Sequence, residues 1–276
     1  MKTKKLSVGR ILMYLFLMIV LLIMLVPFVW LILSSFRPNA DLFNEPFGIP
    51  KNLSFANYIA VLKSHPMVLY FFNTVVIALI ATIITISAAV LASYALMYRF
   101  KVKPFVLLLF SIGLFIPTNA FLVPYYVMIN KIGLYDTNLG IALVYAGVNF
   151  PMSLMVIKGY MDTIPQELLE SAKIDGANSK KILLKVVLPM SKPGIVTACV
   201  FIVINSWNEL LFANLLNQSD KSRTIQVAIR SFLTTFEANY AYAFAAMVIA
   251  ILPTVIVYAL LTDKIIGGMT AGAVKG

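Results

Sequence analysis

The sequence is poor in the residues from which most active sites and metal sites are built. It contains one cysteine, Cys199, and one histidine, His65, and so offers neither a disulfide nor a zinc-binding cluster. We recognise no Ser–His–Asp set and no pair of catalytic carboxylates, and the sequence has no G-x-x-x-x-G-K-[ST] phosphate-binding loop. We therefore expect no enzymatic activity, no metal and no bound cofactor on this chain.

Charged residues are also scarce, at 12% of the chain against roughly 25% in an average globular protein. Hydrophobic residues make up 61%, and apolar runs long enough to cross a hydrocarbon core of about 30 Å recur along the chain. These runs predict an all-α, polytopic membrane protein with six transmembrane helices. We place the spans near residues 11–35, 70–97, 105–128, 139–158, 194–216 and 241–262.

The net charge of +11 is distributed unevenly among the segments that link these spans. Six spans put both termini on one side, and the segments on that side hold 15 of the 22 lysines and arginines. The positive-inside rule assigns this side to the cytoplasm. The charge therefore predicts topology rather than nucleic-acid binding: a single transmembrane domain over 1–276, with residues 1–10, 163–189 and 263–276 in the cytoplasm.

Residues 163–189 form a long polar interruption, which predicts a helix–turn–helix between the fourth and fifth spans. Thr163 and Gln166 have the spacing of a capping box at the start of the first helix. Gly176 is expected to end that helix, because glycine readily adopts the left-handed conformation found there. An apolar stripe recurs at four-residue spacing: Ile164, Leu168 and Ala172.

The second helix of this motif can be capped by Asn178 or Ser179 and is expected to stop before Leu188-Pro189. A helical surface held at the membrane face is suited to docking a partner protein. The alternative interpretation is an ordinary solvated loop.

The fifth span contains a polar run that is unusual for a membrane helix, Asn205-Ser206-Trp207-Asn208-Glu209. A carboxylate inside a membrane costs on the order of a few kcal/mol, so Glu209 should face protein or water. Asn205, Trp207, Asn208 and Glu209 are therefore candidates for lining a translocation pathway. In such a pathway the indole would stack on a sugar and the amides would bind hydroxyl groups. The alternative is a clamp between helices.

Residues 170–189, ESAKIDGANSKKILLKVVLP, resemble the cytoplasmic signature of ABC importer permeases, which reads E-A-A, three residues, G, nine residues, I, one residue, L-P. The matching positions are Glu170, Ala172, Gly176, Leu188 and Pro189. Ser171 stands for the second alanine and Val186 for the isoleucine, and both departures are conservative in size. Segments 73–96, 206–213 and 268–276 are similar to the carbohydrate-uptake branch, and most of all to its maltose-permease second-subunit type.

The resemblance implies a permease subunit in the bacterial cytoplasmic membrane that forms half of a pathway for a sugar. It also implies three partners: a second, similar permease, a pair of ATPase subunits that bind the ATP, and an external solute-binding protein. The residues that it implies for ATPase coupling are Glu167, Glu170, Ser171, Ala172, Asp175, Gly176 and Ala177. The tail, 263–276, can reach the same ATPase interface.

Two other classes of protein remain as alternatives. An ion-coupled secondary carrier would need an ion site, for which Glu209 is the available residue. A membrane-embedded enzyme would need the catalytic set that the sequence lacks. Within the importer interpretation, the solute stays open among di- or oligosaccharides, sugar acids and glycerol phosphates.

Overall fold

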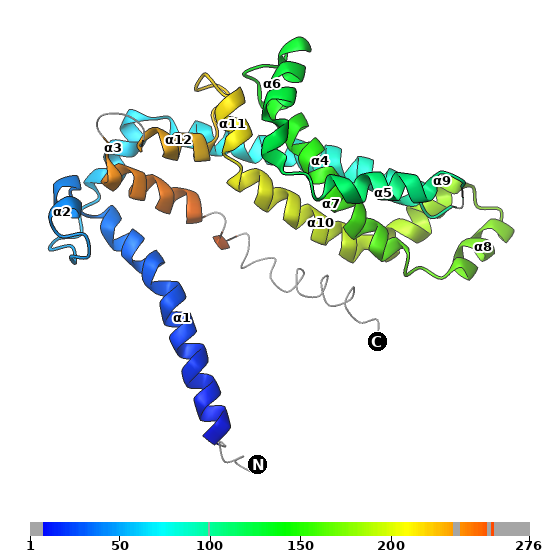
Figure 1. Ribbon diagram of the computed structural model, residues 1–276, viewed down its shortest axis with the longest axis horizontal. Coiled ribbons are helices and arrows are strands. Elements are labelled where there is room, and N and C mark those ends of the chain that lie inside the picture. The colour runs from blue at the N-terminus through cyan, green and yellow to red at the C-terminus, as the bar shows by residue number, and fades with distance from the viewer. Residues whose placement is uncertain (1–7, 99, 234–237, 253–254, 257–276) are drawn as a thin grey trace. The chain divides into compact units, whose positions relative to one another are not determined.

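The computed structural model describes residues 8–98, 100–233, 238–252 and 255–256, and none of these residues lies in a strand (Figure 1). This agrees with the predicted all-α class. The chain divides into two compact units, one of residues 1–65 and 229–252 and one of residues 66–228 and 253–276. Within the described residues, four helices are long and apolar enough to cross a membrane, and a bent helix pair supplies a fifth candidate.

The first unit begins with α1 (Val8–Ser35), a 28-residue apolar helix that corresponds to the first expected span. Two short helices follow, α2 (Asn39–Asn44) and α3 (Ala56–Ser64), and the amide of Ala56 donates to the hydroxyl of Ser54 at the start of α3. An apolar helix over Tyr240–Leu252 completes the unit. The expected sixth span, 241–262, lies partly outside the described residues.

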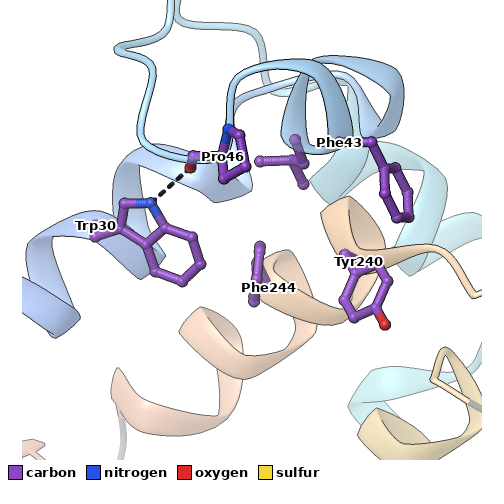
Figure 2. A pocket seen from close by; sticks show the side chains of 6 residues that line it. Trp30, Phe43, Pro46, Tyr240 and Phe244 are labelled. Atoms are coloured by element: carbon purple, nitrogen blue, oxygen red, sulfur yellow. Dashed lines mark hydrogen bonds between the residues drawn. The ribbon is translucent and has the colours of Figure 1, made fainter.

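Aromatic side chains of the first unit surround a pocket of about 260 Å³ (Figure 2). The indole nitrogen of Trp30 donates a 2.9 Å hydrogen bond to the carbonyl of Pro46, and its ring meets Phe244 edge-on at 5.3 Å. Phe43 and Tyr240 face each other in a similar edge-on contact at 5.5 Å. These contacts join the end of α1 to α2 and to the helix at 240–252.

The second unit is built around three packed helices: α4 (Met67–Ala95), α7 (Asn138–Met161) and α10 (Leu188–Asn208) (Figure 1). Small residues permit this packing, since Ala81 and Ala89 of α4 are fully buried. These helices correspond to the second, fourth and fifth expected spans. Residues 163–189, the segment predicted to couple to an ATPase and called the coupling segment below, lie at one end of this bundle, around α8 (Gln166–Ile174) and α9 (Ser179–Ile182). Helix α11 (Leu211–Leu216) lies at the other end (Figure 1).

The third expected span, 105–128, is not one straight helix. It divides into α5 (Lys103–Gly113), a 3-10 turn (Thr118–Phe121) and α6 (Leu122–Lys131), with a bend of 98° between the two parts. Pro117 stands at the break with an extended backbone, because proline supplies no amide proton for a continuing helix.

The expected end of the second coupling helix before Leu188-Pro189 is wrong. Residues Ser179–Asn208 form one 30-residue helix, which comprises α9 (Ser179–Ile182), a π-helical turn (Leu183–Val187) and α10. The amide of Leu188 donates to the carbonyl of Leu183, five residues earlier. This wide turn changes the hydrogen-bond pattern just before Pro189, so the proline lies in the first turn of α10, where its missing amide is tolerated.

The fifth expected span, 194–216, is also divided. It breaks at Glu209, whose backbone is extended, and continues as the short helix α11 (Leu211–Leu216). The chain then passes through a connecting segment, 217–224, to α12 (Ile225–Ser231).

The first coupling helix, α8 (Gln166–Ile174), follows Pro165, and no side chain caps it. The predicted capping box is therefore wrong, and the hydroxyl of Thr163 instead donates to the carbonyl of Tyr160. The apolar stripe was also misplaced, since Leu168 is 44% exposed and Leu169 is buried. The reason is that a strict spacing of four residues drifts around a helix with about 3.6 residues per turn.

Candidate functional site

The turn after α8 has the geometry predicted for it. Gly176 adopts a left-handed backbone with φ +76°, and its amide donates to the carbonyl of Lys173. The amide of Ala177 donates to the carbonyl of Ala172, which completes a Schellman motif. Gly176 therefore ends α8 as the sequence predicted, and the chain reverses without strain because glycine has no Cβ.

The second coupling helix starts at the cap that the sequence offered. The side-chain oxygen of Asn178 accepts a 2.9 Å hydrogen bond from the amide of Lys181. The hydroxyl of Tyr94, at the end of α4, donates to the carbonyl of Ser179 at 3.0 Å. The helix–turn–helix is thus fixed to the membrane bundle by a side chain of another helix, and is not a free loop.

A buried apolar cluster holds one side of the coupling segment against α4 and α7. It includes Leu169, Ile182, Ile157 and Met161. The opposite side remains exposed and carries most of the residues that the resemblance implied for coupling: Glu167, Glu170, Ser171, Asp175 and Gly176, with Ala172 and Ala177 half-buried. Sequence reasoning missed Ile174, which is 86% exposed and lies one helical turn from Glu170.

Glu170 also lines a cleft of about 590 Å³ between α8 and the end of α4. Lys103, Lys173 and Asp162 share this cleft, so charges of both signs face it. Asp162 is paired with Lys158, and the ammonium of Lys173 lies 5.5 Å from the ring centre of Tyr98. The exposed coupling surface is therefore polar, structured and bordered by a groove.

At the other end of α10, two of the four pathway candidates are not among the residues that line the polar pocket of this region. Trp207 is only 8% exposed, and its ring meets Phe71 of α4 edge-on at 5.5 Å. Asn208 is exposed, but its amide group donates back to the carbonyl of Ile204 within the same helix. The contact that Trp207 makes is a packing contact between helices, which was the alternative interpretation of the polar run.

The other two candidates, Asn205 and Glu209, line a pocket of about 280 Å³. Asn205 donates a 3.0 Å hydrogen bond to the side-chain oxygen of Asn149 on α7. The remaining lining residues are Thr118, Tyr145, Val148, Asn149, Ser206 and Phe212. The hydroxyl of Ser206 is buried and has no hydrogen-bond partner among the described residues.

The carboxylate of Glu209 accepts three hydrogen bonds in this pocket. One carboxylate oxygen accepts from the amide of Phe212 at 2.9 Å. The other accepts from the amide of Ala213 at 3.0 Å and from the hydroxyl of Tyr145 at 2.7 Å. The carboxylate of Glu209 therefore faces protein, as expected for a carboxylate within a membrane span.

Two sets of polar contacts fix the segment that follows α11. Asp136 has a left-handed backbone with φ 57°, and its carboxylate accepts hydrogen bonds from the amides of Gln218 and Ser219 and from the hydroxyl of Ser222. Burial raises the pKa of Asp136, but the hydrogen bonds from Ser222, Ser219 and Gln218 outweigh burial and lower the pKa to about 2. The segment is thus held by an ionised carboxylate at neutral pH.

A second set of contacts ties the same segment to α4. The hydroxyl of Tyr70 and the guanidinium of Arg223 both donate to the carboxylate of Asp220. The amide of Asn73 donates to the carbonyl of Arg223 at 3.0 Å, and its oxygen accepts from Asn138 of α7. No local pattern in the sequence indicates these partners of Asn73, which lie 65 and 150 residues further along the chain.

Comparisons with known proteins agree with this architecture. Residues 81–269 match the family described as "Binding-protein-dependent transport system inner membrane component". The trehalose/maltose transport system permease protein MalG of Thermococcus litoralis is 32% identical, over 97% of this chain and 97% of the relative. The sulfoquinovosyl glycerol transport system permease protein SmoH of Agrobacterium fabrum is 30% identical, over 91% and 89%.

A solved structure supports the fold. The crystal structure of a bacterial ABC transporter involved in the import of the acidic polysaccharide alginate contains a chain that superposes with a TM-score of 0.79. The match covers 95% of this chain and 98% of that chain, at 22% identity. At this identity the likeness establishes the helical arrangement.

Proposed function

The chain belongs to the family of binding-protein-dependent transport system inner membrane components, and we propose that it is the permease subunit of an ATP-driven sugar importer. The observation that carries this proposal is the continuous helix Ser179–Asn208. It begins in the exposed coupling segment and ends at the polar pocket. A displacement imposed on the coupling segment is therefore transmitted to the pocket without crossing a flexible loop.

In this proposal, an ATPase subunit receives α8, with Glu170 facing basic groups of that partner and Ile174 packing beside it. Closure of two ATPase subunits on ATP would move the coupling segments of two permeases toward each other. The pocket would then change its access from one side of the membrane to the other. ATP stays on the partner, so this chain needs no cofactor of its own.

A sugar is the proposed solute for two reasons. Relatives are named for transport of trehalose/maltose, sulfoquinovosyl glycerol and arabinooligosaccharides. The pocket offers amide and hydroxyl groups at Asn149, Asn205 and Thr118, and no basic side chain is among the described residues that line it. Such groups both donate and accept hydrogen bonds, as binding to sugar hydroxyls requires.

The proposed topology has six spans with both termini in the cytoplasm, and the sixth span covers 241–262. It is supported by the excess of lysine and arginine in the segments assigned to the cytoplasm. It is also supported by the placement of the coupling segment and α11 at opposite ends of the bundle.

The proposed partners are a second permease, a pair of ATPase subunits and an external solute-binding protein. The apolar surface of α1 fits a place in the membrane beside lipid or a second permease, because its most apolar 18-residue window contains no buried residue. The tail, 263–276, which lies outside the described residues, is proposed to reach the ATPase interface.

An ion-coupled carrier has less support. Its ion site would rest on Glu209, but the carboxylate of Glu209 already accepts three hydrogen bonds from the protein itself. The remaining pocket groups are neutral amides and hydroxyls. The geometry therefore favours the importer over the carrier.

The test is co-purification of the tagged chain with an ATPase, followed by sugar-dependent ATP hydrolysis in liposomes. Glu170→Lys reverses a charge on the exposed coupling face, and Gly176→Pro cannot adopt the left-handed turn. Both variants should lose the ATPase or its coupled activity. Gly176→Asn should retain activity because asparagine tolerates this conformation, and Asp41→Lys should retain it because Asp41 is an exposed acid that lies outside the motif in the sequence.

The proposal fails if the chain purifies alone, moves solute down an ion gradient and is indifferent to Glu170→Lys and Gly176→Pro. That result would support the carrier and would make Glu209 the residue to study.

A further inference from the structure

The break between α10 and α11 leaves backbone amides without the carbonyl partners that a continuous helix would give them. The backbone of Glu209 is extended, with ψ 126°, so the amides in the first turn of α11 have no carbonyl of α10 to bind. Phe212 and Ala213 of this turn are buried, so their amides cannot turn to bulk water and must find partners within the protein.

The side chain of Glu209 supplies these partners. Its two oxygens accept from the amides of Phe212 and Ala213, so the residue that interrupts the helix also caps the helix that follows. The same carboxylate accepts from the hydroxyl of Tyr145, which belongs to α7 and is only 1% exposed. One side chain therefore joins the end of α10, the start of α11 and the middle of α7.

These contacts also determine one wall of the polar pocket. Glu209, Tyr145 and Phe212 all line it. Phe212 is 2% exposed and meets the ring of Tyr125 on α6 edge-on at 5.5 Å, so its position is determined from both sides. If α11 moved, Phe212 would be displaced from the pocket wall.

We propose that Glu209 is a positioning residue, whose carboxylate caps α11 and holds it against α7 so that the pocket wall keeps its shape during transport. This inference rests on the proposed function in one respect, which is that the pocket binds a transported solute. It differs from the pathway interpretation, in which Glu209 would bind the solute itself. The acceptor sites of the carboxylate are largely occupied by Tyr145, Phe212 and Ala213, which leaves little capacity for a ligand.

Hydrogen exchange tests the cap directly and without any solute. The assembled transporter would be placed in lipid nanodiscs and exchange followed at the amides of Phe212 and Ala213. In Glu209→Ala we expect both amides to exchange roughly ten- to a hundred-fold faster, because each loses a charged acceptor. Leu211→Ala, at an exposed position of the same helix, should leave both rates unchanged.

Glu209→Gln is the conservative variant in case Glu209→Ala fails to fold. Glutamine replaces one acceptor oxygen by a donor amide, so one of the two α11 amides should stay protected and the other should exchange faster. Uptake measurements then separate positioning from binding. Glu209→Gln and Tyr145→Phe should lower kcat while KM stays within about three-fold of wild type, because neither removes a solute contact.

Unchanged exchange at Phe212 and Ala213 in both Glu209 variants would overturn the inference. So would a rise in KM of about ten-fold or more in Glu209→Gln with no such rise in Tyr145→Phe, since that pattern identifies a solute ligand. Failure of the importer proposal would appear instead as absence of an ATPase partner, and would not affect the exchange result.

Discussion

Gly194 of α10 lies directly against the ring of Tyr160 of α7. A Cβ at position 194 would be 2.4 Å from Cδ2 and 2.6 Å from Cγ of Tyr160. The glycine therefore permits the close approach of two membrane helices, as small residues commonly do.

We predict that Gly194→Ala destabilises the protein by about 1–3 kcal/mol, because the ring or the helices must move to admit a methyl group. The measurement is the thermal unfolding midpoint of the purified protein in nanodiscs. Gly159→Ala is the matched control, since a Cβ at Gly159 would meet nothing within 4 Å. Equal losses in the two variants would show that the Gly194–Tyr160 contact is not the cause.

The second prediction concerns Asp136 and pH. Its pKa is lowered from 3.8 to about 2 by hydrogen bonds from the segment after α11, so the carboxylate stabilises the fold when it is ionised. This contribution is complete above about pH 4 and is lost as the pH falls toward 2. Asp136→Asn should therefore unfold at a lower temperature than wild type at pH 7, and the difference should shrink below pH 4.

Asparagine is the informative substitution at position 136 because it also tolerates the left-handed backbone of this residue. The variant thus changes the charge without adding backbone strain. A difference in unfolding temperature that stays constant from pH 7 to pH 2 would contradict an electrostatic contribution.

The third prediction separates two neighbouring residues of the polar run. Trp207→Ala should cost about 3–5 kcal/mol of stability, because a buried indole that packs on Phe71 is removed. Ser206→Ala should leave stability nearly unchanged, because the buried Ser206 hydroxyl makes no hydrogen bond among the described residues that the substitution would remove. Thermal unfolding and uptake kinetics on both variants provide the measurements.

Phe71→Ala is the control for this pair. It should resemble Trp207→Ala in unfolding, since the two rings form one contact. If Trp207→Ala kept its stability but changed solute selectivity, the indole would belong to the pathway as the sequence suggested.

The fourth prediction concerns a buried arginine in the first unit. Arg37 is only 3% exposed, and its guanidinium donates to the carbonyls of Asp41, Glu45 and Pro46. Arg37→Lys should loosen this loop at a cost of about 1–3 kcal/mol, because an ammonium cannot reproduce the planar fork of donors.

Trp30 reports on the same loop, since its indole also donates to the carbonyl of Pro46. In a Trp207→Phe background, where Trp30 is the remaining tryptophan, Arg37→Lys should shift the emission to longer wavelength as water enters. Arg10→Lys, at an exposed position of α1, should not shift it.

Local signals in the sequence were sufficient for several features. The apolar runs located α1, α4 and α7 within a few residues, because their composition alone requires burial or lipid. Gly176 and Asn178 act through their own backbone or through an amide three residues away, so the turn after α8 and the cap of α9 could be predicted from neighbouring residues.

The rest depended on partners distant in sequence. Pro117 and Pro151 both lie inside expected spans, yet only Pro117 breaks its helix. Helix α7 packs against both α4 and α10, and these contacts offset the backbone hydrogen bond that Pro151 removes. Helix α5 has no buried residue and so has no such packing to offset the hydrogen bond that Pro117 removes. Likewise, Trp207 packs on Phe71, and Glu209 accepts a hydrogen bond from Tyr145. No local pattern in the sequence indicates either partner.

The π-helical turn at Leu183–Val187 determines how the two ends of the helix Ser179–Asn208 are rotated relative to each other about the helix axis. Removing one residue from this turn would shorten the helix by only about 1.5 Å but rotate one end against the other by about 100°. The distance between the coupling segment and the pocket would hardly change. The direction in which one faces relative to the other would change by about 100°. The orientation of the coupling segment about the helix axis can therefore vary almost independently of its distance from the pocket.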